Sequence, residues 1–177
     1  MKRAYSLAFL VLTFTLLAAW PKVARAQGAF EQVTGKAFDT ALPKDFYLEG
    51  NAIPTEKRNA AVLKTPAGAR VVLALIDTAG YSSQIRQKYV GMLITEGKIS
   101  VCGIPVSVGS YGFGLDRPAA TSNEDAKFIL YNQAGEKIGE CASKKDTKIK
   151  LPKPLVSMLS IEGPAKIYLG RYVLDIK

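Results

Sequence analysis

Cysteine and the carboxylic acids are the residue types in this sequence that could form a specific chemical centre. The chain of 177 residues has two cysteines, Cys102 and Cys141, and 15 acidic residues, but no histidine. Without histidine, a Ser-His-Asp or Cys-His catalytic centre cannot form, and the commonest metal ligand is missing. Two cysteines 39 positions apart do not make a zinc pattern, so we expect no catalytic triad, no metal and no cofactor. Two carboxylic acids facing one cleft could still hydrolyse a glycosidic bond, although the sequence does not indicate which two.

The segment Val108–Pro118 (VGSYGFGLDRP) carries two aromatic residues between glycines. Glycine lets another chain approach closely, and an exposed ring offers a flat face to a sugar, a base or an apolar ligand. On this interpretation Tyr111 and Phe113 line a binding groove, and Arg117 anchors an anionic group. The alternative is a bent or bulged strand in which Tyr111, Phe113 and Leu115, each two residues apart, fill the core.

A second aromatic candidate is the pair Tyr168 and Tyr172. If Lys166–Ile176 is one strand, both rings lie on one face, about 13 Å apart at ~3.3 Å per residue. Such a pair could form a carbohydrate-binding platform. The alternative is that both rings pack in the core, with their hydroxyl groups reaching its rim.

A lysine-rich segment follows the second cysteine. As a basic loop it could bind an anionic polymer or an acidic lipid surface. The alternative is a solvated connection whose lysines protect a sheet edge. The segment has no arginine and no aromatic residue, whereas surfaces that bind nucleic acid usually combine both, so we expect no nucleic-acid partner. The lysines are Lys144, Lys145, Lys148, Lys150 and Lys153.

The N-terminus has the pattern of an export signal. A basic start (Lys2 and Arg3), an apolar run over Ala4–Trp20 and an Ala-Arg-Ala exit predict a signal peptide over residues 1–26. An uncleaved anchor is the alternative, because spanning a bilayer needs ~17–25 apolar residues. Cleavage removes four basic residues and no acid, which lowers the net charge from +9 to +5. We therefore expect a periplasmic or secreted protein with no transmembrane segment after cleavage.

Both cysteines lie beyond the predicted cleavage site. An even number of cysteines in an exported chain predicts a disulfide between Cys102 and Cys141. The bridge would close a loop of about 40 residues and stabilise the fold by ~4 kcal/mol in the chain-entropy model. Two buried free thiols, packed as small hydrophobic side chains, are the alternative.

The chain from residue 45 onward has the pattern of a β protein. Short runs rich in Val, Ile, Tyr and Phe are separated by Gly, Pro and Asn clusters. Val71–Ile76 is apolar at every position, which predicts a central strand covered on both faces. Lys98–Val108 is read as one strand, and Pro105 predicts that this strand either lies at a sheet edge or is bulged at that residue. Eight or nine short strands favour an all-β fold, a single antiparallel β-sandwich, with a β-barrel as the alternative.

At most one or two short helices are expected. The pattern predicts one over Ser83–Val90, capped by Ser82. Residues 27–44 form a lead-in segment that is either a short helix or disordered. Residues 45–177 are then a single β domain.

These observations favour an exported, non-enzymatic binding or interaction module. A glycan, an anionic polymer or another envelope protein is the kind of partner that we expect. A carboxylate-dependent hydrolase acting on an envelope or extracellular polymer is one alternative. A structural subunit that docks through a sheet edge, such as the strand containing Pro105, is another.

Overall fold

A computed structural model describes residues 29–119, 121–148, 154–159 and 164–177. The predicted signal peptide and its cleavage site lie outside the described residues. The described chain begins with strand β1 (Glu31–Val33) and helix α1 (Gly35–Ala41).

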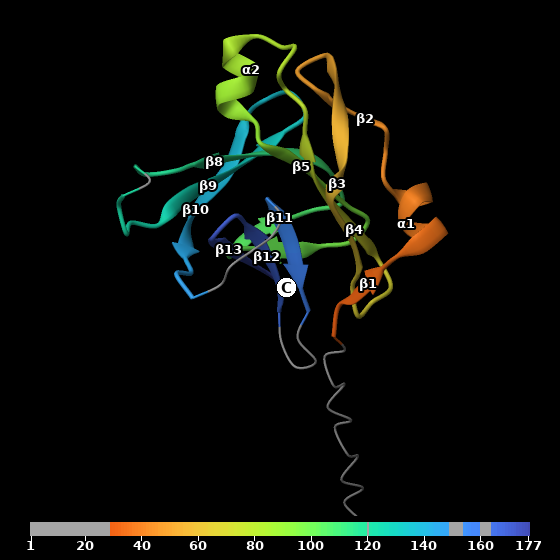
Figure 1. Cartoon of the computed structure of the whole chain (residues 1–177). Coiled ribbons are helices and arrows are strands. Elements are labelled where there is room, and N and C mark those ends of the chain that lie inside the picture. Colours follow the sequence, from red (N-terminus) through yellow and green to blue (C-terminus); the bar gives the residue numbers. More distant parts are fainter. Residues whose placement is uncertain (1–28, 120, 149–153, 160–163) are drawn as a thin grey trace, which may run out of the picture.

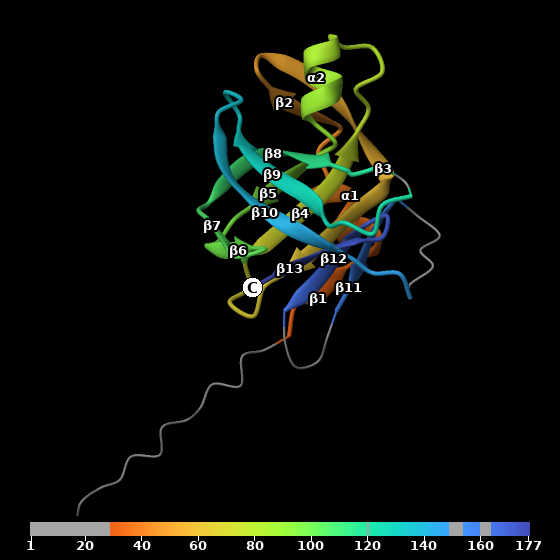
Figure 2. The ribbon, with the colours of Figure 1, turned by 90° about the vertical axis from the view of Figure 1, so that its left-hand side faces the viewer.

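The strands that follow form one antiparallel sheet (Figures 1 and 2). Along the sheet the order is β1-β3-β4-β5-β8-β9-β10-β13-β12-β11. Strand β2 adds to β3, and the hairpin of β6 and β7 adds to β13. The strands are β2 (Asp45–Leu48), β3 (Asn51–Lys64), β4 (Arg70–Ile76), β5 (Gly91–Thr95), β6 (Ile99–Val101), β7 (Ile104–Val106), β8 (Gly109–Asp116), β9 (Ala126–Asn132), β10 (Lys137–Lys145), β11 (Leu155–Met158), β12 (Ala165–Leu169) and β13 (Tyr172–Ile176).

The sheet curls into a half-barrel, and the predicted all-β antiparallel class is confirmed. One continuous sheet supplies the opposed layers, with β8, β9 and β10 on one side and β11, β12 and β13 on the other (Figure 1). Its concave side encloses the larger core, in which Leu73, Phe113, Leu130, Ile167 and Leu174 are buried. Burying one large apolar side chain stabilises a fold by about 1.5–3 kcal/mol, so this core is the main source of stability.

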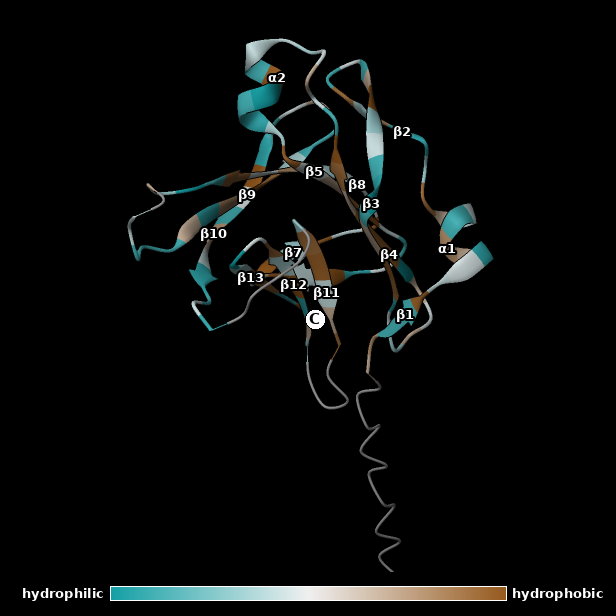
Figure 3. Ribbon diagram, in the orientation of Figure 1, coloured by the Kyte–Doolittle hydropathy of each residue, from teal (hydrophilic) through white to brown (hydrophobic). Residues whose placement is uncertain are grey.

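A smaller core lies on the convex side of β3, β4 and β5. Helix α2 (Ser83–Lys88) and strand β2 cover it with Ile85, Phe46 and Leu48. Strand β4 therefore contributes to both cores, as its uninterrupted apolar sequence predicted. Hydrophobic residues concentrate on the central strands, whereas the outer surface of α2 is mainly hydrophilic (Figure 3). The predicted cap of α2 is confirmed, because the backbone N–H of Ile85 donates to Ser82 Oγ at 3.3 Å.

Two segments that the sequence analysis read as single strands are hairpins. Lys98–Val108 turns at Cys102 and Gly103, both of which have positive φ angles (50° and 82°). Lys166–Ile176 turns at Gly170, which has φ of 66°. Glycine adopts this backbone conformation at no steric cost, so a glycine is enough to form each turn. The residues on either side of the turn continue the apolar alternation of a strand.

Strand β7 is an edge strand, as Pro105 predicted: among the described strands it pairs only with β6. Ser100, which lies opposite Pro105, exchanges both backbone hydrogen bonds with Lys177 at 2.8 and 2.9 Å. The Ser100–Pro105 pair is therefore a non-hydrogen-bonded pair of the hairpin. The proline nitrogen faces the outer edge and costs the hairpin no hydrogen bond.

Candidate functional site

The aromatic residues of Val108–Pro118 belong to the core. Phe113 is 1% exposed and Tyr111 9%, which agrees with the alternative of a strand whose alternate residues fill the interior. Arg117 is exposed just beyond the end of β8, while Tyr111 lies near its beginning. The structure therefore does not bring Tyr111, Phe113 and Arg117 together in a groove.

Gly112 and Gly114 of this segment face the convex side, where helix α2 ends. A Cβ atom on Gly112 would lie 2.7 Å from the Tyr89 ring, and one on Gly114 would lie 2.3 Å from the Lys88 carbonyl oxygen. The Gly-aromatic alternation thus serves packing on both faces of β8. A concavity of about 420 Å³ remains where β8 begins, lined by Tyr111, Asn132 and Ile138 among others.

The predicted platform of Tyr168 and Tyr172 is wrong, because a hairpin turn separates the two residues. Tyr168 in β12 lies opposite Val173, and Tyr172 in β13 lies opposite Leu169. Adjacent register pairs point to opposite faces of a sheet, so the two rings do not share a face. Both are buried, with exposures of 3% and 9%.

The predicted basic loop is partly strand. Lys144 and Lys145 end β10; Lys144 is exposed, whereas Lys145 donates to the backbone carbonyl of Ser122. Lys148 is exposed just after the strand. Lys150 and Lys153 lie outside the described residues. Of Lys144, Lys145 and Lys148, Lys144 lines the pocket described below.

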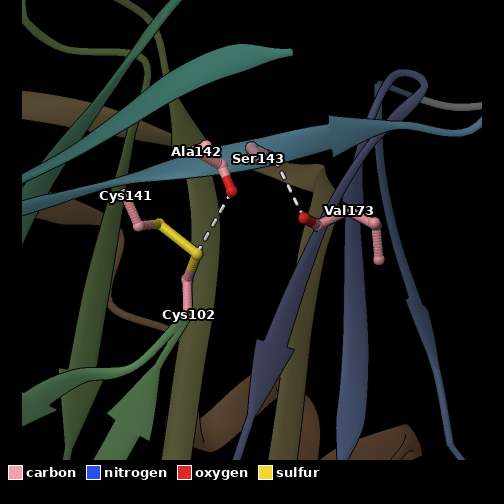
Figure 4. Close-up of a disulfide and its surroundings, with 5 residues drawn as sticks. All are labelled: Cys102, Cys141, Ala142, Ser143 and Val173. Carbon is pink, nitrogen blue, oxygen red and sulfur yellow. Dashed lines mark hydrogen bonds between the residues drawn. A yellow bond between two sulfur atoms is a disulfide. The ribbon is translucent and has the colours of Figure 1, made fainter.

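The predicted disulfide between Cys102 and Cys141 is present, with the two Cα atoms 6.3 Å apart (Figure 4). It links the turn of the β6–β7 hairpin to the middle of β10. On the β10 side, the buried Ser143 hydroxyl donates to the Val173 carbonyl at 2.9 Å. These two connections join β10 to the opposite wall of the half-barrel.

A pocket of about 300 Å³ lies between these connections, where β10 separates from β13 and β6. We call it the wedge. Lys144 projects from one wall, and Asp175 and Lys177 from the other; Lys166 lies directly opposite Asp175 on the neighbouring strand. Among the described residues, neither Lys144 nor Lys177 forms an ion pair. The full lining is Ser100, Cys102, Gly103, Ala142, Lys144, Val173, Asp175 and Lys177.

A second polar cluster joins the β2–β3 turn, the β9–β10 turn and the C-terminal end of α2. Lys88 Nζ donates to Glu49 Oε1 at 2.5 Å and to the Gly135 carbonyl at 2.7 Å. The Tyr89 hydroxyl donates to the same Glu49 oxygen at 2.6 Å. The Lys88 ammonium also lies 4.9 Å from the centre of the Tyr131 ring, within cation–π range.

The pKa values in this cluster reflect its pairing. Hydrogen bonds from Lys88 and Tyr89 hold the pKa of Glu49 below its usual value of 4.5. Burial, together with the hydrogen bond to Glu49, raises the pKa of Tyr89 above its usual value of 10.0. Glu49 also has a positive φ of 48° at the β2–β3 turn, a conformation that is costly for a residue other than glycine. The cluster therefore acts as a structural clamp that holds this turn against α2.

One concavity, of about 540 Å³, brings two carboxylic acids together: Glu31 and Glu96. Arg70 donates to both oxygens of Glu96 at 2.9 Å, and this pairing lowers the pKa of Glu96. A general acid for glycoside hydrolysis needs the opposite, a raised pKa. Glu96 is therefore held as an ion-paired carboxylate beside Arg70 and does not have the property of a general acid.

Comparison of the chain with protein-family models, with curated proteins and with solved structures finds no match. Neither of the two helices in the described residues is long and apolar enough to cross a membrane.

Sequence reasoning found one wall of the wedge and missed the other. Lys144 belongs to the predicted basic loop, but Asp175 and Lys177 lie in and just after β13, some thirty residues later. The cysteine pair was the available signal, because a bridge from Cys141 to Cys102 brings the lysine segment beside the β6–β7 hairpin.

Proposed function

We propose that this protein is an exported, non-enzymatic module that binds an acidic polysaccharide through the wedge. The observation that carries the proposal is the disposition of charge around this pocket. Lys144 lines the pocket from β10 and Lys177 from the end of the β13 segment, and they form no ion pair in the described part of the chain. Lys166 adds a third ammonium group beside the single acid, Asp175.

The shape of the wedge suits an anionic group carried on a chain. A pocket of about 300 Å³ admits one carboxylate- or sulfate-bearing sugar unit. Ammonium groups on two walls could contact that anion from both sides, and a disulfide and a strand ladder fix the distance between the walls. A net charge of +5 after signal-peptide removal would favour approach of a polyanion.

The proposal can be tested by titrating the purified protein into fluorescently labelled dextran sulfate, with neutral dextran as the comparison. We expect the anisotropy to rise with dextran sulfate alone, and the affinity to fall between about 20 mM and about 200 mM salt because exposed charges are screened. The double variant Lys144→Gln/Lys177→Gln should bind at least about tenfold more weakly, or ~0.7 kcal/mol for each lost ammonium group. Asp175→Asn should bind more tightly.

A matched control separates the wedge from overall charge. Lys36→Gln/Lys64→Gln removes the same two charges from α1 and β3, whose lysines do not line the wedge. Its affinity should stay within about twofold of the parent protein. Equal weakening of the two double variants, or equal binding of neutral dextran, would contradict the proposal.

A further inference from the structure

We propose that the wedge exists as a binding site only when Cys102 and Cys141 are oxidised, so that disulfide formation makes the protein competent to bind. This inference rests on the proposed function, since it concerns the regulation of the same site. It follows from how the two walls of the wedge are attached to the rest of the molecule.

The wall that carries Lys144 is weakly attached to the wall opposite. Strands β10 and β13 share two register pairs, Lys144–Val173 and Lys145–Tyr172, and just beyond them the Asp146 N–H donates to the Arg171 carbonyl at 2.7 Å. Towards Cys141, β10 leaves β13 and continues its pairing with β9 alone. Beyond the Ser143 hydroxyl, the disulfide and the packing of Ile104 on Gly139 are the connections across this gap in the described residues.

The wall that carries Asp175 and Lys177 is held independently of the disulfide. Ser100 and Lys177 exchange backbone hydrogen bonds at 2.8 and 2.9 Å, and the Cys102 N–H donates to the Asp175 carbonyl at 2.7 Å. The side chains of β6 and β13 that face inward are buried in the larger core. Reduction would therefore leave this wall in place and release the part of β10 on the Cys141 side of Ser143, which widens the wedge at its Ala142 rim.

The chemistry requires an oxidising partner of the disulfide class. The Cys102 and Cys141 thiols lose two electrons and two protons as their S–S bond forms, and the partner's disulfide becomes a dithiol. Reducing compartments keep thiols free, whereas export exposes them to such oxidants. The polyanion site would then be absent in the newly made chain and would appear after export.

The test compares dextran sulfate binding by the oxidised protein, by the same protein reduced with dithiothreitol, and by the reoxidised protein. Dithiothreitol is uncharged, so it does not compete as an anion. Far-UV circular dichroism reports the sheet in each sample. We expect affinity at least about tenfold lower after reduction, an unchanged β spectrum, and recovery on reoxidation. The variant Cys102→Ser/Cys141→Ser should behave like the reduced protein.

The outcomes separate this inference from the proposed function. If the oxidised protein does not bind dextran sulfate, the proposed function is wrong. If oxidised and reduced forms bind equally, the proposed function stands and the redox dependence is overturned. Loss of the β spectrum in both the reduced protein and the serine variant would also overturn the redox dependence. Strands β6 and β13 would then unfold without the disulfide, instead of staying in place.

Discussion

Two clusters of charged side chains in this molecule differ in whether their charges are paired within the fold. In the clamp of Glu49, Lys88 and Tyr89, the carboxylate accepts two hydrogen bonds and the ammonium group donates two. In the wedge, Lys144 and Lys177 line an open pocket and form no ion pair within the described chain. Lysine therefore serves as an internal connector at one place and as a surface cation at the other.

The difference shows why a list of charged residues does not locate a binding site. The side chains of Glu49 and Lys88 are each 22% exposed, so removing one partner leaves the other partly buried and poorly hydrated. The wedge lysines are exposed and already hydrated, so their interaction with each other and with the fold is small. Stability should depend on the first cluster, and binding on the second.

The largest expected effect on stability comes from comparing one lysine of the clamp, Lys88, with one lysine of the wedge, Lys144. Each is replaced by methionine, which keeps most of the side-chain volume. Lys88→Met leaves the Glu49 carboxylate without its cation and should lower the free energy of unfolding by about 2–3 kcal/mol. Lys144→Met should change it by no more than about 0.5 kcal/mol. Urea unfolding of the two variants measures both. If both variants lost a similar amount of unfolding free energy, the clamp and the wedge would not differ in their contribution to stability.

Packing around the clamp gives the next largest effect. Gly114→Ala places a Cβ atom 2.3 Å from the Lys88 carbonyl, so α2 must shift, at a cost of about 1–3 kcal/mol. Gly80→Ala is the control, because a Cβ atom there meets nothing within 4 Å. Thermal unfolding of both variants makes the comparison. An unchanged melting temperature for Gly114→Ala would show that the end of α2 does not press on β8.

The smallest effect is the pH dependence of stability. The pKa of Glu49 is lower in the folded than in the unfolded chain, so its stabilisation is complete above 4.5 and is lost as the pH falls further. The pKa of Tyr89 is raised, so its contribution is complete below 10.0 and is lost as the pH rises beyond that value.

Urea unfolding across the pH range can isolate both contributions. Glu49→Gln should flatten the loss of stability between about pH 5 and about pH 3, and Tyr89→Phe should flatten the loss above about pH 10. Both comparisons are made against the parent protein, because other groups titrate in the same ranges. An acid limb with the same slope in Glu49→Gln and in the parent would show that Lys88 does not stabilise the carboxylate.

Much of the fold could be predicted from local sequence. Strand β4 was recognised because Val71–Ile76 is apolar at every position, and α2 because a serine cap precedes its helical pattern. The hairpins at Cys102 and Gly170 were missed because each turn interrupts an apolar alternation for only two residues. Such a turn reverses the strand and changes which residues share a face, and this is why the tyrosine platform was wrong.

The candidate site was less accessible to prediction. The wedge draws Lys144 from β10, Asp175 from β13 and Lys177 from the position just after β13. No periodicity links these strands, and their separation depends on where the β10–β13 ladder stops. Tertiary structure alone determines that position.

Pro105 has a consequence for the behaviour of the protein at high concentration. A strand approaching the outer edge of β7 meets the Pro105 carbonyl group, but no N–H group at that residue. It can donate a hydrogen bond there and receives none in return. Edge-to-edge association, the first step of many aggregation reactions, is thus disfavoured at a strand whose inward neighbours, Ile104 and Val106, are strongly apolar. A single imino acid thus removes one backbone hydrogen bond from any strand that pairs with this margin of the half-barrel.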